Sequence, residues 1–253
     1  MAKDIGEQVM QELLRALSRD GVKNSAKMNY GLNLLARYRA REIGGALYGK
    51  GGPLVRTGPF RGMTLLNRAS EGNVAPKLLG CYEQELHDVI ERCIETPYEC
   101  VVNVGCGDGY YAVGLARRMP KSEIIAYDLH EGRRALCKDA AEENGVGARV
   151  SMGAECGTAE LTALAGRRVL VICDIEGGER ELLDPEQIPA LKGFDILVEL
   201  HENVDKALPE EIISRFAESH EIERIQHQGR DPTAFKELEF VSQFDQFLAL
   251  WEG

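Results

Sequence analysis

Residues 101–109 read V-V-N-V-G-C-G-D-G, an apolar run that breaks into three glycines two residues apart. The apolar run predicts a buried strand, and the pattern of residues 111–119 predicts a helix directly after the turn. Gly105, Gly107 and Gly109 allow a tight turn and the close approach of a ligand, because glycine has no Cβ. The stretch predicts the opening unit of a Rossmann-like fold, although a glycine-rich turn without a ligand has the same pattern.

The spacing of the glycines distinguishes two kinds of nucleotide-binding fold. A dinucleotide fingerprint, G-x-G-x-x-G, needs glycine at position 110, where this chain has Tyr110. The spacing G-x-G-x-G instead resembles motif I of class I methyltransferases that use S-adenosylmethionine. A nicotinamide-dependent oxidoreductase is therefore disfavoured.

The composition is that of an ordinary globular protein, with 253 residues, of which 44% are hydrophobic and 28% charged. This length suits one sizeable α/β domain with a modest extension. No apolar run approaches the ~20 residues that span a membrane, and the first residues lack the apolar core of a signal peptide. The seven cysteines contain no C-x-x-C pair, so neither a disulfide framework nor a zinc site is suggested. We expect a cytoplasmic protein with no membrane partner.

The charge is distributed unevenly along the chain. The net charge of −11 argues against binding to nucleic acid. Residues 1–62 contain 11 basic and 5 acidic residues, a net charge of +6, which leaves −17 for the remaining residues. The basic segment could bind an anionic substrate or partner, complement the acidic part of the chain, or form a solvated face.

The N-terminal part of the chain has the pattern of two helices, over residues 4–19 and 25–43. Gly44-Gly45 would end the second helix, and a glycine-rich linker follows. We divide the chain into an N-terminal helical extension with its linker (residues 1–57) and a main domain (residues 58–253). The extension could be a substrate lid, a dimerisation element that forms a homo-oligomer, or a packing appendage.

From residue 100 on, predicted strands alternate with predicted helices, which is typical of a parallel sheet with helices on both faces. A further helix is expected before them, over residues 76–95. The expected strands cover residues 100–105, 123–128, 148–152, 168–173, 194–200, 221–228 and 244–251. The predicted fold class is α/β, a Rossmann-like, seven-stranded, mostly parallel sheet flanked by helices, with an N-terminal helical extension.

Acidic residues follow the second and third expected strands. Asp128 ends the second strand about 20 residues after the glycine turn, where a carboxylate can accept hydrogen bonds from both ribose hydroxyls of a nucleoside. Its alternative role is the N-cap of the next helix. Glu155 follows the third strand and is a candidate for the adenine amino group, or else a solvated loop acid.

The fourth and fifth expected strands also release polar residues at their carboxyl ends. Asp174 follows the fourth strand, and Glu199-Leu200-His201 ends the fifth. The period of two along a strand puts Glu199 and His201 on the same side. Because the carboxyl ends of parallel strands meet at one edge, these groups could abstract a proton or hold a divalent metal. Alternatively, one acid binds the methionine amino group and the others support it.

Several segments carry a resemblance to a known family. Residues 77–83 read K-L-L-G-C-Y-E, residues 174–179 read D-I-E-G-G-E, and residues 198–201 read V-E-L-H. Together with the glycine turn, these segments resemble the FkbM-type family of S-adenosylmethionine-dependent methyltransferases, over about residues 58–203. The resemblance implies O-methylation, commonly of a sugar or secondary-metabolite hydroxyl. It also implies cofactor contacts at Glu83, the glycine turn, Asp128 and Asp174.

One position departs from the family pattern. Motif I usually carries Asp where this chain has Asn103, which removes a negative charge near the methionine amino group. The expected cofactor is S-adenosylmethionine, and its predicted contacts are Glu83, Asn103, Gly105, Gly107, Gly109, Asp128, Glu155 and Asp174.

The sequence leads to one function and two alternatives. We expect methyl transfer to a hydroxyl oxygen of a small molecule, with His201 as the base, Glu199 or Asp174 orienting it, and no metal. The first alternative is an N-methyltransferase acting on an amine or a protein side chain. The second is a non-catalytic S-adenosylmethionine-binding module that uses its basic helices for a partner. Arg230, near the chain end, is a further candidate for binding an anionic substrate group.

Overall fold

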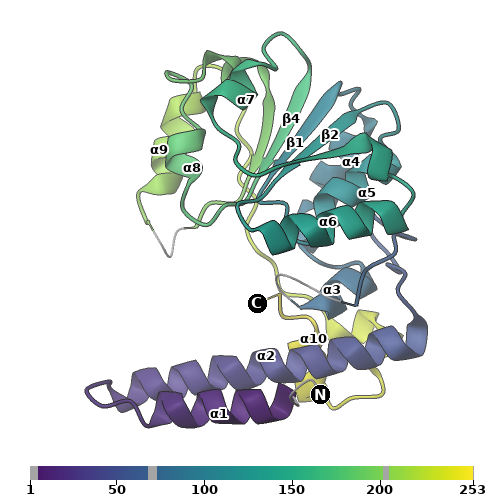
Figure 1. The fold of residues 1–253 in the computed structure, drawn as a ribbon, viewed down its shortest axis with the longest axis vertical. Coiled ribbons are helices and arrows are strands. Elements are labelled where there is room, and N and C mark those ends of the chain that lie inside the picture. Colours follow the sequence, from purple (N-terminus) through teal and green to yellow (C-terminus); the bar gives the residue numbers. More distant parts are fainter. Residues whose placement is uncertain (1–4, 68–72, 202–204, 253) are drawn as a thin grey trace.

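The larger part of the molecule is a parallel sheet with helices on both faces (Figure 1). The computed structural model describes residues 5–67, 73–201 and 205–252. The strand order is β3-β2-β1-β4-β5, and every pair is parallel. The strands are β1 (Cys100–Val104), β2 (Glu123–Tyr127), β3 (Val150–Gly153), β4 (Val169–Cys173) and β5 (Asp195–Val198).

The central strands β1 and β4 are buried along their whole length, which explains their uninterrupted apolar sequences. Alternate residues enter two cores, so that Val101 packs on one face of the sheet and Val102 on the other. One core is closed by α4 (His87–Glu95), α5 (Tyr110–Arg118) and α6 (Glu131–Glu143). The other is closed by α7 (Thr158–Thr162), α8 (Glu179–Leu182), the 3-10 turn at Pro189–Gly193 and α9 (Leu208–Phe216).

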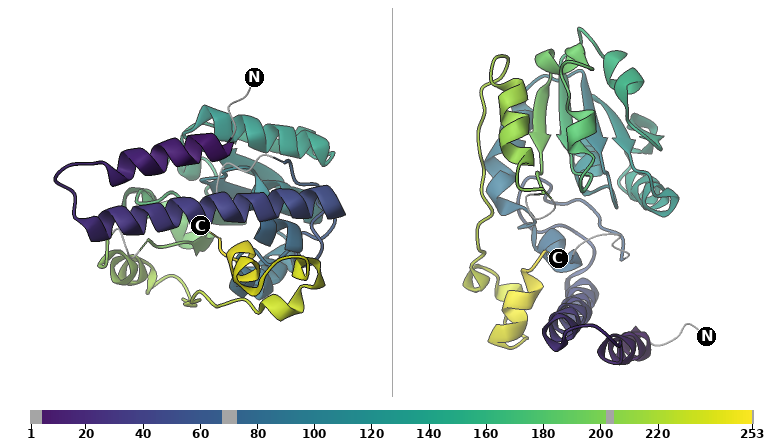
Figure 2. Two further views of the ribbon diagram at one scale, coloured as in Figure 1. Left: turned by 90° about the horizontal axis from the view of Figure 1, so that it is seen from below. Right: turned by 90° about the vertical axis from the view of Figure 1, so that its left-hand side faces the viewer.

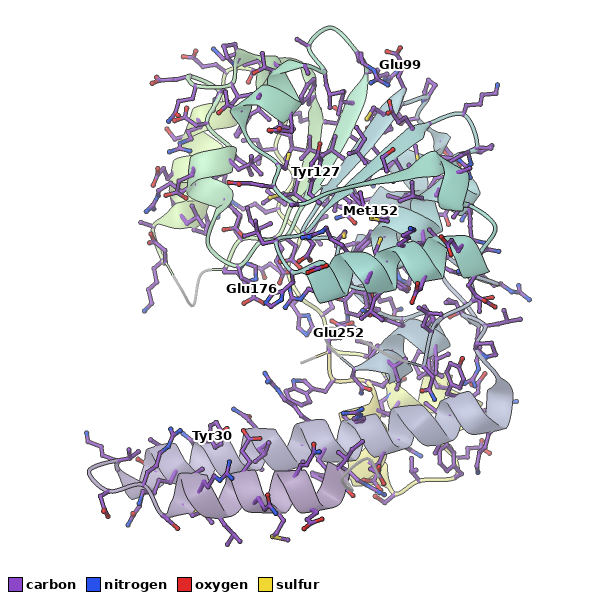
Figure 3. The ribbon with its side chains drawn as sticks, in the orientation of Figure 1. Tyr30, Glu99, Tyr127, Met152, Glu176 and Glu252 are labelled. Carbon is purple, nitrogen blue, oxygen red and sulfur yellow. The ribbon has the colours of Figure 1, made fainter. Side chains whose placement is uncertain are left out.

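The strand order reverses between β1 and β4. From β1 the chain continues to β2 and β3 on one side, and it returns to β4 and β5 on the other. In open α/β sheets, ligands bind outside the carboxyl ends of the strands at such a switch point. Figure 3 shows Glu99, before β1, at one end of the sheet and Glu176, after β4, at the opposite end. The glycine turn and Asp174 therefore lie at the edge where a ligand is expected.

The expected number of seven strands is wrong, because the sheet of the described residues has five. Residues 221–228 form no strand; they run as an irregular segment held by side-chain ion pairs. Arg92 pairs with Glu223 at 2.6 Å and Arg224 with Glu210 at 2.6 Å. Ile222 is 40% exposed, so this segment lacks the buried face that would stabilise an edge strand.

The expected strand over residues 244–251 is also wrong, because this segment is the helix α10 (Gln243–Ala249). Its larger apolar residues Phe244, Phe247 and Leu248 are spaced three and four apart, which suits a helix better than a strand. The side chain of Ser242 caps the helix by accepting a hydrogen bond from the Asp245 N–H at 3.2 Å. The Ser242 cap and the helical spacing of the apolar residues thus explain why this segment is a helix and not the expected strand.

The N-terminal helices form an antiparallel hairpin of α1 (Ile5–Leu17) and α2 (Asn24–Gly51). The predicted stop at Gly44-Gly45 is wrong, since α2 continues seven residues further to Gly51. A Cβ at Gly44 would overlap the side chain of Val74, at the start of α3 (Val74–Leu79). Gly44 therefore allows two helices to approach closely and does not end one. The helix expected over residues 76–95 is divided into α3, a 3-10 turn at Gln84–Leu86, and α4.

The second half of α2 joins the hairpin to the rest of the molecule. Ile43 and Leu47 are buried in a third core, formed with α3 and α10. Arg39 donates two hydrogen bonds to Asp245 of α10, at 2.8 and 2.7 Å. The first half of α2 and α1 project beyond the sheet domain (Figures 1 and 2). None of the described helices has the length and apolar character of a transmembrane segment.

Candidate functional site

The turn after β1 is held in a backbone conformation that favours glycine. Gly105, Gly107 and Gly109 have φ angles of +80°, +54° and +88°. A Cβ at Gly105 would overlap the carbonyl oxygen of Asp174, so the loops after β1 and β4 are in direct contact. A Cβ at Gly109 would lie 2.8 Å from the sulfur of Cys137, which lets α5 pack closely on α6. All three glycines are therefore required by the backbone geometry.

Asp128 lies against this turn from the end of β2. Its Oδ2 accepts a hydrogen bond from the Gly107 N–H at 3.1 Å, and its Oδ1 accepts one from the His130 N–H at 2.8 Å. The Asp128 side chain is 4% exposed. A carboxylate oxygen can accept two hydrogen bonds, so each oxygen retains capacity for one ribose hydroxyl. These acceptor oxygens fit the two hydroxyl donors of a nucleoside diol beside the glycine turn.

The alternative role of Asp128, the N-cap of the next helix, is wrong. The N-cap of α6 is His130, and no side chain caps this helix terminus. Asp128 instead closes a short turn before the helix, through its bond to the His130 N–H. Arg134 fixes the same turn from within α6 by donating to the Asp128 carbonyl at 2.6 Å.

On the other side of the switch point, the structure brings together the three residues predicted to carry catalysis. His201 Nε2 lies 3.6 Å from Asp174 Oδ1 and 4.0 Å from Glu199 Oε1. The His201 side chain is 16% exposed, whereas Asp174 is 36% and Glu199 57% exposed. Nε2 thus faces two partly exposed carboxylates, while the His201 ring is largely buried.

The other ring nitrogen of His201 contacts a residue without an assigned role in the sequence analysis. His201 Nδ1 lies 3.2 Å from Glu179 Oε1, and the Glu179 side chain is completely buried. Glu179 also accepts hydrogen bonds from the Gly177 N–H at 2.9 Å and the Ile175 N–H at 3.4 Å. An ionised carboxylate can only accept hydrogen bonds, so the contact with Glu179 favours the tautomer in which Nδ1 carries the proton and Nε2 presents a lone pair.

The sequence contained a weak signal for Glu179. It is the last acid of the D-I-E-G-G-E segment, two residues after a glycine with φ of +119°, Gly177. Burial separates it from the exposed acids around it, and a single sequence does not reveal burial.

The same cluster has the composition of a divalent-metal site. One ligand atom each from Asp174, Glu199 and His201 can be chosen so that all three lie within 4.8 Å of one another. One imidazole and two carboxylates suit several divalent ions. Proton abstraction and metal binding therefore remain alternative uses of the same groups.

Glu83 has a strained backbone and a buried carboxylate. Its φ of +46° is unusual for a residue other than glycine. The carboxylate accepts a hydrogen bond from the Tyr111 hydroxyl, and its backbone N–H donates to Glu252 at 2.7 Å. Burial raises the pKa of Glu83 above its ordinary value, against hydrogen bonds from Tyr111 and Tyr82 that lower it. The charge of Glu199 raises the pKa of Glu83 as well, which links Glu83 to the cluster of Asp174, Glu199 and His201.

Aromatic rings and a buried ion pair surround Glu83. Tyr110 makes edge-to-face contacts with Phe60, Tyr82 and Tyr111, at centroid distances of 5.2 to 5.6 Å. Lys77, which is 4% exposed, lies 2.9 and 2.8 Å from the two carboxylate oxygens of Asp108 in the glycine turn. Lys77 belongs to the K-L-L-G-C-Y-E segment, and its pairing with Asp108 was not predicted.

Three other candidates have different surroundings. Asn103 is 3% exposed within β1, and Glu155 is exposed in the segment after β3. Arg230 is not available to a substrate, because its side chain is 3% exposed and paired with Glu85 at 2.8 Å and Glu252 at 2.7 Å. The prediction that Arg230 binds an anionic substrate is therefore wrong, since two internal acids already neutralise its charge.

Comparison with known proteins gave distant structural likenesses only. No protein-family model and no curated protein matches the sequence. A Klebsiella pneumoniae protein assigned as an O-methyltransferase is 12% identical, with a TM-score of 0.41 and 83% of each chain covered. The O-methyltransferase TomG from Streptomyces achromogenes, in complex with S-adenosylmethionine, is 16% identical, with a TM-score of 0.41 over 56% of this chain and 70% of TomG.

The bifunctional kinase–methyltransferase WbdD is 20% identical, with a TM-score of 0.37 over 49% of this chain. The chain spans only 28% of the length of WbdD. At identities of 20% or less and TM-scores of 0.41 or less, none of these likenesses assigns an activity to the chain.

Proposed function

We propose that this chain is an S-adenosylmethionine-dependent methyltransferase that acts on a hydroxyl oxygen of a small molecule. The observation that carries the proposal is Asp128 at the end of β2, bonded to the Gly107 N–H of the glycine turn. This places an acid suited to a ribose diol beside the topological switch point, where nucleosides bind in this type of sheet. The G-x-G-x-G spacing supports S-adenosylmethionine over a dinucleotide.

The chain's own residues would provide alignment and proton removal. Bound S-adenosylmethionine supplies a sulfonium methyl group that is already reactive toward nucleophiles. Holding the acceptor in line with that methyl group lowers the entropic part of the barrier. His201 Nε2 would accept the proton of the acceptor hydroxyl, and Glu179 would stabilise the resulting imidazolium through its contact with Nδ1. Asp174 would either orient His201 or hold the methionine amino group.

Calorimetric titration tests the proposal. The wild-type protein is titrated with S-adenosylmethionine, S-adenosylhomocysteine and NAD(H), because dinucleotide-binding folds also contain the strand order 3-2-1-4-5. We expect micromolar binding of the first two, weakened about 10- to 100-fold in Asp128→Ala by the loss of charge-assisted hydrogen bonds. Asp20→Ala, in the exposed turn between α1 and α2, is the matched control and should bind as the wild type does.

The same titration identifies the outcomes that contradict the proposal. Preference for NAD(H), or absence of binding by both sulfur compounds, would overturn it. Equal weakening in Asp20→Ala would show that the effect of Asp128→Ala is not specific to the site. A change in affinity on adding a chelator would favour the metal alternative at Asp174, Glu199 and His201.

Two alternatives to O-methylation are separated by activity measurements. An amine acceptor needs less help from a base, so turnover that is unaffected in His201→Ala would favour N-methylation of an amine or a protein side chain. Tight cofactor binding without turnover on any acceptor would favour a non-catalytic S-adenosylmethionine-binding module.

The proposal also includes the class of acceptor and the cellular location. The resemblance to the FkbM-type family supports a sugar or secondary-metabolite hydroxyl as the acceptor. All seven cysteines are free, and six of them are buried, which supports a reducing, cytoplasmic location.

A further inference from the structure

The α1–α2 hairpin exposes more apolar surface than two helices can bury between themselves. Gly31 of α2 faces Leu13 of α1, because a Cβ at Gly31 would lie 2.9 Å from Leu13 Cδ1. Apart from Val22 in the turn (41%) and Tyr30 (43%), six large apolar residues of the hairpin are at least 40% exposed. They are Met10 (56%), Leu14 (57%), Leu17 (40%), Met28 (66%), Leu32 (67%) and Leu35 (45%).

These six residues lie on one side of the hairpin. The residues one position before the Leu13–Gly31 contact, Glu12 and Tyr30, meet on one side, where the Tyr30 hydroxyl donates to the Glu12 carboxylate. In an antiparallel pair, the residues one position after the contact, Leu14 and Leu32, must then meet on the opposite side. The others follow these two at spacings of three and four residues, which extends one stripe along each helix.

The six residues, here called the hairpin face, lie away from the catalytic crevice. Figure 3 shows Tyr30 on the side of the hairpin turned toward the sheet, so the hairpin face is on the far side. The same side continues along α2 to Arg39, which pairs with Asp245 of α10. Figure 2 shows α1, α2 and α10 side by side at this end of the molecule. A partner on the hairpin face would leave the crevice open.

The residues that border the hairpin face differ in charge from those on the opposite side of the hairpin. Here Arg15 and Arg19 line a hollow with Tyr30, on the opposite side of the hairpin. Beside the hairpin face the helical period places the uncharged residues Ser18, Ser25 and Asn29 and one acid, Glu7. Two copies of this face can meet without repulsion between bases.

We propose that the chain forms a two-fold symmetric dimer in which the hairpin faces of two copies pack as a four-helix bundle. Stripes spaced three and four residues apart on two antiparallel helices are half of such a bundle, and a two-fold axis pairs each face with itself. Burying six large, half-exposed side chains on each copy removes on the order of 1,200 Å² in total, the lower bound for a stable interface.

Sedimentation velocity of the full chain tests this proposal independently of methyl transfer. We expect the wild type to have twice the mass of one 28.0 kDa chain. Leu14→Glu combined with Leu32→Glu should have the mass of one chain, with an unchanged circular dichroism spectrum, because both side chains are exposed. Gln8→Glu combined with Asn33→Glu adds the same charges at exposed positions away from the hairpin face and should remain dimeric.

Each contrary result overturns the dimer. A wild-type mass of one chain at the highest soluble concentration would do so, as would a Leu14→Glu, Leu32→Glu variant that stays dimeric. Dissociation of the control variant to the same extent would show that net charge, not the hairpin face, controls assembly. Sedimentation of monomeric wild type with phosphatidylglycerol vesicles, lost in the leucine variant, would assign the hairpin face to a membrane surface.

Discussion

The two sides of the crevice are built by different means. On the β1–β2 side, backbone groups determine the geometry: three glycines have positive φ angles, and Asp128 is held by two backbone N–H groups. On the β4–β5 side, the geometry depends on a contact between side chains, since the buried Glu179 holds His201. On the β1–β2 side, an added side-chain atom should therefore destabilise the fold strongly. On the β4–β5 side, changes of charge or pH should have smaller effects on stability.

The largest effect on stability is expected on the β1–β2 side. Gly105→Ala adds a Cβ that overlaps the Asp174 carbonyl and requires a φ of +80°, so we expect a loss of about 3 kcal/mol or more in unfolding free energy. Gly132→Ala, in the first turn of α6 with open space around it, should be neutral or stabilising by up to about 1 kcal/mol. Denaturant unfolding of both variants measures the difference. Similar stability of the two variants would contradict the proposed contact between the loops after β1 and β4.

An intermediate effect is expected at Glu179. Glu179→Gln keeps the size of the buried side chain but removes the charge that holds the proton on His201 Nδ1. We expect the Nδ1–H tautomer of His201 to lose its dominance in 15N NMR spectra, and stability to fall by about 1–2 kcal/mol. Glu181→Gln, at an exposed position two residues further along, is the control and should leave the tautomer unchanged. An unaltered His201 spectrum in Glu179→Gln would show that Glu179 does not set the tautomer.

The smallest effect is expected at Glu252, and it depends on pH. Burial raises the pKa of Glu252 from 4.5 to about 7, although the Glu83 N–H and Arg230 act to lower it. The folded protein therefore binds this proton more tightly than the unfolded chain does. The contribution of Glu252 to stability is largest below pH 4.5 and is lost as the pH rises toward about 7.

Thermal unfolding of Glu252→Gln from pH 4.5 to 8 measures this contribution. Between pH 4.5 and 7, the Tm of the variant should fall less than the Tm of the wild type does. Glu237→Gln, which removes an exposed carboxylate from the same C-terminal region, should retain the full decline. Identical pH profiles for wild type and Glu252→Gln would exclude a proton-dependent contact at this position.

The sequence predicted the parts of the crevice that depend on chain order. Apolar strands that alternate with helices imply parallel pairing, and parallel pairing brings Asp128, Asp174 and Glu199 to one edge. The convergence of Asp174, Glu199 and His201 followed from this rule, and the structure brings these three together. Their roles in binding and catalysis remain predictions.

Other features depended on contacts between segments that are distant in the chain. The expected sixth and seventh strands failed because a short apolar pattern does not reveal whether a neighbouring strand is present to pair with it. The expected stop at Gly44 failed because the same residue can end a helix or admit a neighbouring one, here α3. Arg230 was misinterpreted because its two acidic partners are about 145 and 22 residues away.

The sequence by itself determined the order of the five parallel strands and the residue types at the carboxyl end of each, because both follow from local periodicity. Only the tertiary structure decided which of those residues are buried, which acids contact the two ring nitrogens of His201 and which face of the hairpin is left uncovered. Burial and hydrogen bonding are properties of groups brought together from separate segments, and local periodicity carries no information about them.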